Sequence, residues 1–151
     1  MDAAIPRKEM CEFIEATLSS GSVFLLHATG YSMYPFIRNG TRVEILPLNH
    51  ARLRVGDIVV YRTDRMPLVI HRVIETRSDT IICKGDNLRE PDTPVSIDAI
   101  VGRVRPGGFA GLLANVPLFN RVVADVSRRT NWIRSGTGFI AGLRRHRRAD
   151  R

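Results

Sequence analysis

Between Ser22 and about Val104, short apolar runs alternate with turn residues, which is the pattern of β-strands joined by tight connections. The turns between the runs are rich in Gly, Asn, Asp and Pro, the residues that turns prefer. The candidate strands are VFLLHA, RVEIL, DIVVYR, LVIHRVIE, TIICK and AIVGRV. Six strands in about eighty residues favour a mainly β domain, a coiled antiparallel sheet or a partly open β-barrel, over a parallel α/β fold.

Helical patterns flank this β segment on both sides. The start, IPRKEMCEFIEATLSSG, predicts a short N-terminal helix, with apolar residues at helical spacing and Gly21 as its stop. After the PGG at 106–108, a second apolar stripe of period 3.6 predicts a helix that lies as a lid on the domain or anchors it to a surface. Its members are Phe119, Val122, Val123, Val126 and Ile133. The predicted organisation is an N-terminal helix at 1–21, a β domain at 22–106 and a helical, Arg-rich C-terminal extension at 107–151.

Length and charge narrow the picture further. A chain of 151 residues suits one domain with a core of its own. The formal net charge of +8 is uneven, because residues 121–151 hold nine arginines and two aspartates. Neither Cys11 nor Cys83 lies in a C-x-x-C pair, so neither a metal cluster nor a disulfide framework is indicated, and a single bridge between the two stays open.

The sequence carries little sign of a membrane span or of nucleic-acid binding. The start lacks a cationic segment followed by an apolar one, and no uncharged stretch is apolar enough for a spanning helix, which predicts a cytoplasmic chain or one peripheral to a membrane. The basic C-terminal helix suits an anionic membrane surface. Nucleic acid is disfavoured as a partner, because the tail offers only Trp132 and Phe139 for stacking and no RNA-binding motif occurs. A membrane-anchoring partner protein would also be compatible with the sequence.

The stretch GYSMYP places Ser32 in a tight turn, where a serine most often bonds its own backbone. A nucleophilic serine requires a positioned base and donors aimed at the oxyanion. The chain has only two lysines, Lys8 and Lys84, whereas His71 lies in LVIHRVI, where alternation puts it on one strand face with Val69 and Val73. An unperturbed histidine titrates near pH ~6.5, so its neutral form is available as a base. The alternative is an ordinary core or edge histidine, which also covers His27, His50 and His146.

A serine–histidine pair is normally completed by a carboxylate that fixes the histidine tautomer. The segment KGDNLREPD offers Asp86 and Asp92 in one polar loop, although Gly, Asp, Asn and Pro together are also ordinary turn chemistry. Each element alone therefore has a structural explanation, and the candidate site depends on their combination.

About residues 23–106 resemble the signal peptidase I family through five sequence blocks. In chain order these blocks are GYSMYP, VGDIVVYR, IHRVIE, CKGDNLREPD and IVGRVRP. The resemblance is to its histidine-using branch, the endoplasmic-reticulum and archaeal type, with blocks S-M-x-P, G-D-I-V, H-R-V, K-G-D-N and V-G. It implies a coiled, barrel-like β domain that hydrolyses peptide bonds after small side chains through an acyl-enzyme, without a metal or cofactor. The implied catalytic residues are Ser32 as nucleophile, His71 as general base and Asp92 as the triad carboxylate. The implied supporting loop is Asp86 and Asn87, and the oxyanion and substrate-binding region is Gly30, Tyr31, Met33 and Pro35.

Two departures from related families bear on function. Signal peptidases usually carry S-G-S-M, whereas Gly30 and Tyr31 precede Ser32 here, so the oxyanion hole would rest mainly on backbone N–H groups. LexA-type repressors share the superfamily and the G-x-S-M spelling, but they use a lysine base and carry a DNA-binding domain. Neither feature is evident in this sequence, which disfavours self-cleavage of the repressor kind. The predicted function is a serine endopeptidase that cleaves a leader or signal-type segment of a polypeptide substrate. The alternative is a catalytically weak or inactive peptide-binding module of the same fold.

Overall fold

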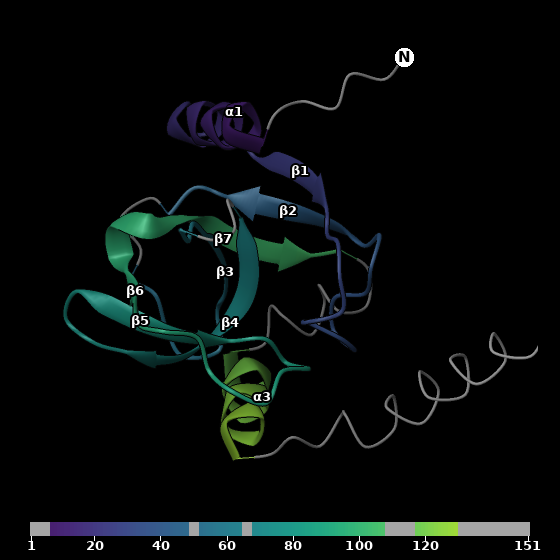
Figure 1. Ribbon diagram of the computed structural model, residues 1–151, viewed down its shortest axis with the longest axis vertical. Helices are drawn as coiled ribbons and strands as arrows, with labels where there is room; N and C mark the ends of the chain where they lie inside the picture. Colours follow the sequence, from purple (N-terminus) through teal and green to yellow (C-terminus); the bar gives the residue numbers. More distant parts are fainter. Residues whose placement is uncertain (1–6, 49–51, 65–67, 108–116, 130–151) are drawn as a thin grey trace, which may run out of the picture.

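The structure is a computed structural model that describes residues 7–48, 52–64, 68–107 and 117–129 (Figure 1). Its helices are α1 (Arg7–Ser19) and α3 (Pro117–Arg129), with a single 3-10 turn, η1 (Ile97–Ala99). Its strands are β1 (Phe24–His27), β2 (Arg42–Leu46), β3 (Ile58–Tyr61), β4 (Val69–Thr76), β5 (Thr80–Lys84), β6 (Val95–Ser96) and β7 (Ile100–Pro106). The predicted C-terminal tail and Ile133 lie outside the described residues.

The seven strands form one antiparallel sheet in the order β1-β2-β7-β3-β4-β5-β6. In the described part of the chain β1 and β6 are the two edges and do not pair with each other, so the sheet is open. Figure 1 shows it strongly curved, with β1, β2 and β7 in one half, β4 and β5 in the other, and β3 between them. The prediction of a mainly β fold with a coiled antiparallel sheet and short flanking helices is confirmed.

Strand β3 lies at the centre of the sheet and is buried on both faces. Its four residues are all apolar or aromatic, which is typical of a strand without a solvent face. Ile58 and Val60 point into one hydrophobic core, which also contains Ile14 from α1. Val59 and Tyr61 point into a second core on the other face. The alternation along β3 therefore carries Tyr61 to the side of the sheet where the candidate catalytic groups gather.

Each of the six predicted apolar runs overlaps a strand. RVEIL and TIICK match β2 and β5 residue for residue, and β7 runs on to Pro106. The seventh strand, β6, was not predicted, because two residues are too few to show a period. On β4 the alternation holds as far as Val73, which lies in the second core with Val69 packed against it, and the register then shifts before Glu75.

The two helices lie at opposite ends of the view in Figure 1. Helix α1 packs on β1 and β7 through Ile14 and Leu18. Phe13, on the same helix, is exposed and packs edge to face against Phe24, with the two ring centroids 5.9 Å apart. Helix α3 packs against β4. No helix within the described ranges combines the length and apolar character needed to cross a bilayer.

The packed face of α3 differs from the predicted apolar stripe. Ala124 is fully buried and Val122 is 51% exposed, while Val123 and Asn120 are half-buried. The face that meets β4 is therefore rotated away from Val122 and includes a polar side chain, Asn120.

Candidate active site

Ser32 lies in the connection between β1 and β2, in a series of tight turns that spans residues 30–37. Gly30 has φ +93°, a left-handed conformation that favours glycine, and its N–H donates to Asn39 Oδ1 at 2.9 Å. The Met33 and Ile37 side chains are buried in the first core, and the Ile37 N–H donates to the Met33 carbonyl at 3.0 Å. These contacts fix both ends of the turn, so the half-buried Ser32 is held at the surface of the core. Pro35 lies in the same turn, after a cis peptide bond.

The loop after β5 supports the serine turn from the side. The Asn87 N–H donates to the Ser32 carbonyl at 2.7 Å, and the Asn87 side-chain amide donates to the Tyr31 carbonyl at 3.1 Å. Gly85 approaches so closely that a Cβ there would lie 2.8 Å from the Ser32 carbonyl oxygen. A side chain at this position would displace the backbone that carries the serine.

His71 and Asp92 meet at the end of the second core. The His71 Nδ1 lies 2.7 Å from Asp92 Oδ2, and the His71 side chain is only 8% exposed. Asp92 is held by its backbone, because its N–H donates to the Cys83 carbonyl at 2.8 Å. With Nδ1–H donating to the carboxylate, the other ring nitrogen, Nε2, carries the lone pair that a general base needs.

Tyr61 is a third member of this cluster that the sequence analysis did not single out. Its hydroxyl donates to Asp92 Oδ2 at 2.7 Å and lies 3.2 Å from His71 Nδ1. Burial, followed by the hydrogen bond to the Asp92 carboxylate, raises the pKa of Tyr61 far above its ordinary value, so the hydroxyl remains a donor. One carboxylate oxygen therefore accepts from two donors, one on β3 and one on β4.

A cavity of about 980 Å³ brings these groups together. Ser32, His71, Asp92 and Tyr61 all line it, and Gly30 and Met33 form part of its wall. Tyr31 is 68% exposed and, like Pro35, is not among the described lining residues. Most of the remaining lining is apolar and comes from α1, from β1 and its continuation, and from β4; it includes Met10, Leu26, Ala28, Ile37, Leu68 and Ile70.

The other titratable candidates take different positions. Lys84 is 3% exposed at the end of β5, where burial lowers the pKa of its ammonium group while Asp86 acts in the opposite direction. Lys84 is not among the described residues that line the cavity, whereas His27 is. His50 and His146 lie outside the described residues. Cys11 and Cys83 are both buried and do not form a disulfide.

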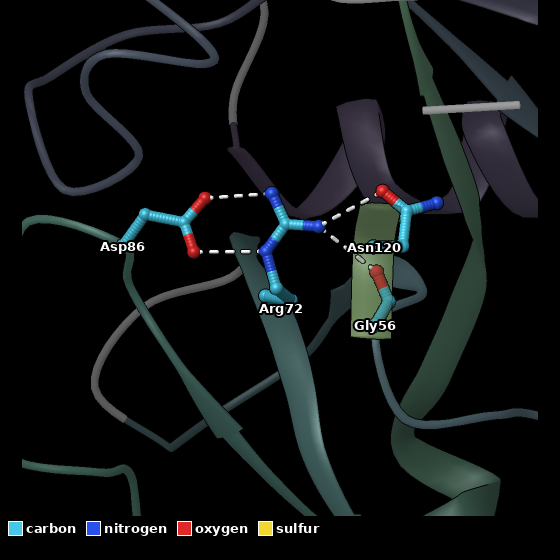
Figure 2. Close-up of polar contacts among 4 residues, drawn as sticks. All are labelled: Gly56, Arg72, Asp86 and Asn120. Carbon is cyan, nitrogen blue, oxygen red and sulfur yellow. Dashed lines mark hydrogen bonds and ion pairs between the residues drawn. The ribbon is translucent and has the colours of Figure 1, made fainter. Parts of the chain in front are cut away.

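Asp86 is bound to Arg72, the residue that follows His71 on β4 (Figure 2). Arg72 Nε and Nη2 donate to the two carboxylate oxygens at 2.9 Å each, and the two side chains are 2% and 1% exposed. Arg72 Nη1 donates to the Gly56 carbonyl at 3.0 Å and to Asn120 Oδ1 at 3.3 Å. Asp86 was predicted from the sequence as part of a supporting loop, whereas its partner Arg72 was not predicted. The one signal was an arginine within an otherwise apolar strand run.

The arrangement can support acyl transfer. A serine, a histidine with its Nδ1 on a carboxylate, and an apolar cavity are the parts that nucleophilic catalysis by serine requires. The Arg72–Asp86 pair connects the serine turn with the histidine strand. Arg72 follows His71 on β4, and Asp86 belongs to the loop that contacts Ser32.

Comparison with known protein families points to a serine peptidase-type fold. A family model described as Peptidase S24-like matches residues 2–105, which is more than two thirds of the chain. The searches of curated proteins and of solved structures returned no match.

Proposed function

Because the chain belongs to the Peptidase S24-like family, we propose that it is a serine endopeptidase with Ser32 as nucleophile, His71 as general base and Asp92 as the carboxylate that orients the base. The observation that carries the proposal is the 2.7 Å contact between His71 Nδ1 and Asp92, at the wall of the cavity that Ser32 also lines. The histidine, in the place of the lysine used by repressor-type relatives, favours the histidine-using signal peptidase branch within the wider superfamily.

In the proposed reaction the Ser32 hydroxyl oxygen attacks the carbonyl carbon of the scissile peptide bond, and His71 Nε2 takes the hydroxyl proton. The tetrahedral intermediate collapses when the same proton passes to the departing amine, which leaves an ester on Ser32. Water, deprotonated by His71, then attacks this ester; the bond between Ser32 Oγ and the acyl carbon breaks, the new carboxyl end of the substrate leaves, and His71 returns the proton to Ser32. Asp92 fixes the tautomer and stabilises the imidazolium that forms in both halves.

The backbone of the serine turn supplies the oxyanion donors in this mechanism. Within the described turn, the N–H groups of Gly30, Tyr34 and Ile37 already bond to other acceptors, and Pro35 has none. The donors for the oxyanion are therefore the N–H groups of Ser32 and its direct neighbours. The contact of Asn87 with the Ser32 carbonyl holds these groups in place, which compensates for the missing serine side chain of the S-G-S-M spelling.

We propose a polypeptide substrate that binds in extended form along β1. This strand is an edge of the sheet, and Leu26 and His27 line the cavity beside Ser32. An extended peptide can pair with such an edge through its main chain, and the apolar cavity accepts its side chains. A leader or signal-type segment with small apolar residues at the cleavage site fits both features.

Covalent labelling tests the mechanism directly. A phosphonate probe that reacts with activated serines should add one mass increment to the wild-type protein, and peptide mapping should locate it on Ser32. Ser32→Ala and His71→Ala should abolish labelling, whereas Ser78→Ala, on an exposed serine away from the cavity, should leave it unchanged. Absence of labelling in folded wild-type protein that still binds leader peptides would support the peptide-binding module instead.

A second cavity supports an anionic membrane surface as a partner. It measures about 920 Å³ and five arginines line it, against two aspartates. These are Arg52, Arg54, Arg103, Arg105 and Arg121, opposed by Asp57 and Asp125. Of these five arginines, only Arg103, with Asp57, and Arg105, with Glu44, form ion pairs within the described residues. The wild-type protein should sediment with anionic vesicles but not with neutral ones. This sedimentation should be lost in Arg54→Glu/Arg121→Glu and retained in Arg77→Glu. Equal sedimentation of the wild-type protein with both vesicle types would contradict the proposal.

A further inference from the structure

Arg72 is the point where helix α3 meets the candidate catalytic site. It is 1% exposed, and its guanidinium has three described hydrogen-bonding partners: Asp86, the Gly56 carbonyl and Asn120 (Figure 2). The first two belong to the segment that the Peptidase S24-like family shares. Asn120, on α3, lies beyond that segment and 48 residues from Arg72. The contact therefore joins the matched segment to a part of the chain that the family model does not cover.

The packing around Gly56 shows that α3 docks in a specific position. Gly56 has φ +101°, and a Cβ on it would lie 2.7–2.8 Å from the backbone and Cβ of Asn120. A glycine is therefore required at this turn both for its conformation and for the approach of the helix. One turn further along α3, Ala124 is fully buried and extends the same packed face. Asn120 is thus held against the turn by close packing as well as by its hydrogen bond.

From Arg72 short paths lead to the catalytic groups along β4 and through Asp86. Along β4, His71 is the adjacent residue. Through Asp86, the path reaches the loop in which Asn87 bonds the Ser32 carbonyl at 2.7 Å and Gly85 packs against the same oxygen. A shift of the guanidinium would therefore move the base and the nucleophile turn together.

We infer that α3 sets the geometry of the active site, and that Asn120 is a positioning residue that acts through Arg72 on the turn that carries Ser32. The inference rests on the proposed function for its effect on catalysis, but its structural half is independent of it. Asn120 accepts from Nη1, so the guanidinium is aligned for its two parallel bonds to Asp86. Without that acceptor, Arg72 keeps its charge partner but loses one of the contacts that fix its orientation.

The key variant is Asn120→Ala, which removes the acceptor while leaving the Cβ that packs on Gly56. Alanine is the better helix former, so a loss of function cannot be assigned to a weaker helix. Asn120→Asp keeps an oxygen acceptor facing Arg72 and serves as the conservative rescue. Val122→Ala, on an exposed residue of the same helix, is the matched control.

Two readouts separate the inference from the proposed function. Hydrogen exchange of the backbone amides in residues 30–37 and 85–88 needs no activity, and Asn120→Ala should accelerate it about tenfold, within the range typical for residues that couple two sites. The rate of Ser32 labelling by the phosphonate probe should fall by a similar factor, with Asn120→Asp and Val122→Ala close to wild type.

Unchanged exchange in both segments of Asn120→Ala, with α3 still protected, would overturn the inference whatever the protein's activity. Equal losses in Asn120→Ala and Asn120→Asp would also overturn it, because the acceptor oxygen would then be irrelevant. If the wild-type protein is not labelled at all, the proposed function fails, and the exchange measurement alone decides whether α3 positions the serine turn.

Discussion

The hydroxyl of Tyr61 offers the sharpest test of the candidate triad, because Tyr61→Phe removes a single oxygen. In the structure Asp92 Oδ2 accepts from Tyr61 and from His71, both at 2.7 Å. Removing one donor leaves the carboxylate, which is 24% exposed, able to rotate toward solvent and away from the imidazole. We therefore expect Tyr61→Phe to loosen the orientation of His71 while leaving the core intact.

The size of the effect follows from the contact that is lost. A hydrogen bond to a charged group contributes about 1.5–3 kcal/mol, and complete loss of that amount from the transition state would slow acylation by about 10- to 150-fold. The lower end applies here, because His71 still bonds the carboxylate and the Asp92 N–H still bonds the Cys83 carbonyl. We expect the rate of Ser32 labelling, and kcat for a cleaved peptide, to fall about tenfold.

The assay needs a control for stability, because Tyr61 is 1% exposed and the loss of its buried hydroxyl hydrogen bond also lowers the free energy of unfolding. Ile81→Val is suitable: Ile81 lies in the same core, is not a described lining residue of the cavity, and should lose about 0.5–1.5 kcal/mol of unfolding free energy. Its labelling rate should match wild type. The double variant Tyr61→Phe/Asp92→Asn should be no slower than Asp92→Asn alone, because Tyr61 acts through Asp92. A wild-type rate in Tyr61→Phe, or a further tenfold loss in the double variant, would refute the reasoning.

Three further predictions address the site and its support. Ser32→Ala should abolish peptide cleavage and His71→Ala should remove most of it, as measured by mass spectrometry of products, with unchanged circular dichroism; cleavage by Ser32→Ala would contradict the mechanism. Asp86→Asn should lower the free energy of unfolding in urea by about 3 kcal/mol, because it leaves a buried guanidinium without its counter-charge; a loss below about 1 kcal/mol would mean that the pair is hydrated. Burial raises the pKa values of Cys83 and Tyr61 above their ordinary values of 9.0 and 10.0, so both groups ionise only on unfolding. The contribution of these two groups to stability is constant below pH 9. Above pH 9 the free energy of unfolding should fall by about 1.4 kcal/mol per pH unit because of Cys83, and above pH 10 by a similar further amount because of Tyr61. In a urea titration series, Cys83→Ala should reduce the part of the fall that begins at pH 9.

The strand pattern was accessible from the sequence because it depends on local properties. Apolar alternation and turn residues gave the positions of six strands, and only the two-residue β6 escaped them. The order of the strands was not accessible, because β7 inserts between β2 and β3 and this pairing joins segments far apart in the chain. It is this insertion that makes β3 central and buries Tyr61 beside His71.

In the candidate site, too, the sequence indicates the residues that stand in local motifs but not those whose role depends on contacts between distant segments. Ser32, His71 and Asp92 stand in recognisable blocks, and the structure brings them to one cavity. Tyr61 ends an apolar strand, where a tyrosine is expected in any core, so nothing in its surroundings indicates a bond to Asp92. Arg72 occupies a strand position at which alternation predicts a polar residue facing solvent. Its burial depends on partners that come from three other segments, and no local pattern contains them.

Asn120 shows why such contacts escape periodicity. A helical stripe ranks faces by apolar content, and on that measure Val122 should point inward and Asn120 outward. The structure has Val122 at 51% exposed and Asn120 bonded to a buried guanidinium. Burying a polar side chain costs little free energy when a buried charged donor bonds to it, whereas leaving that donor without an acceptor costs more. The orientation of α3 is therefore decided by the contacts of Asn120 with Arg72 and Gly56 rather than by the apolar periodicity of the helix. For this physical reason we expect substitution of Asn120 to change the geometry at Ser32.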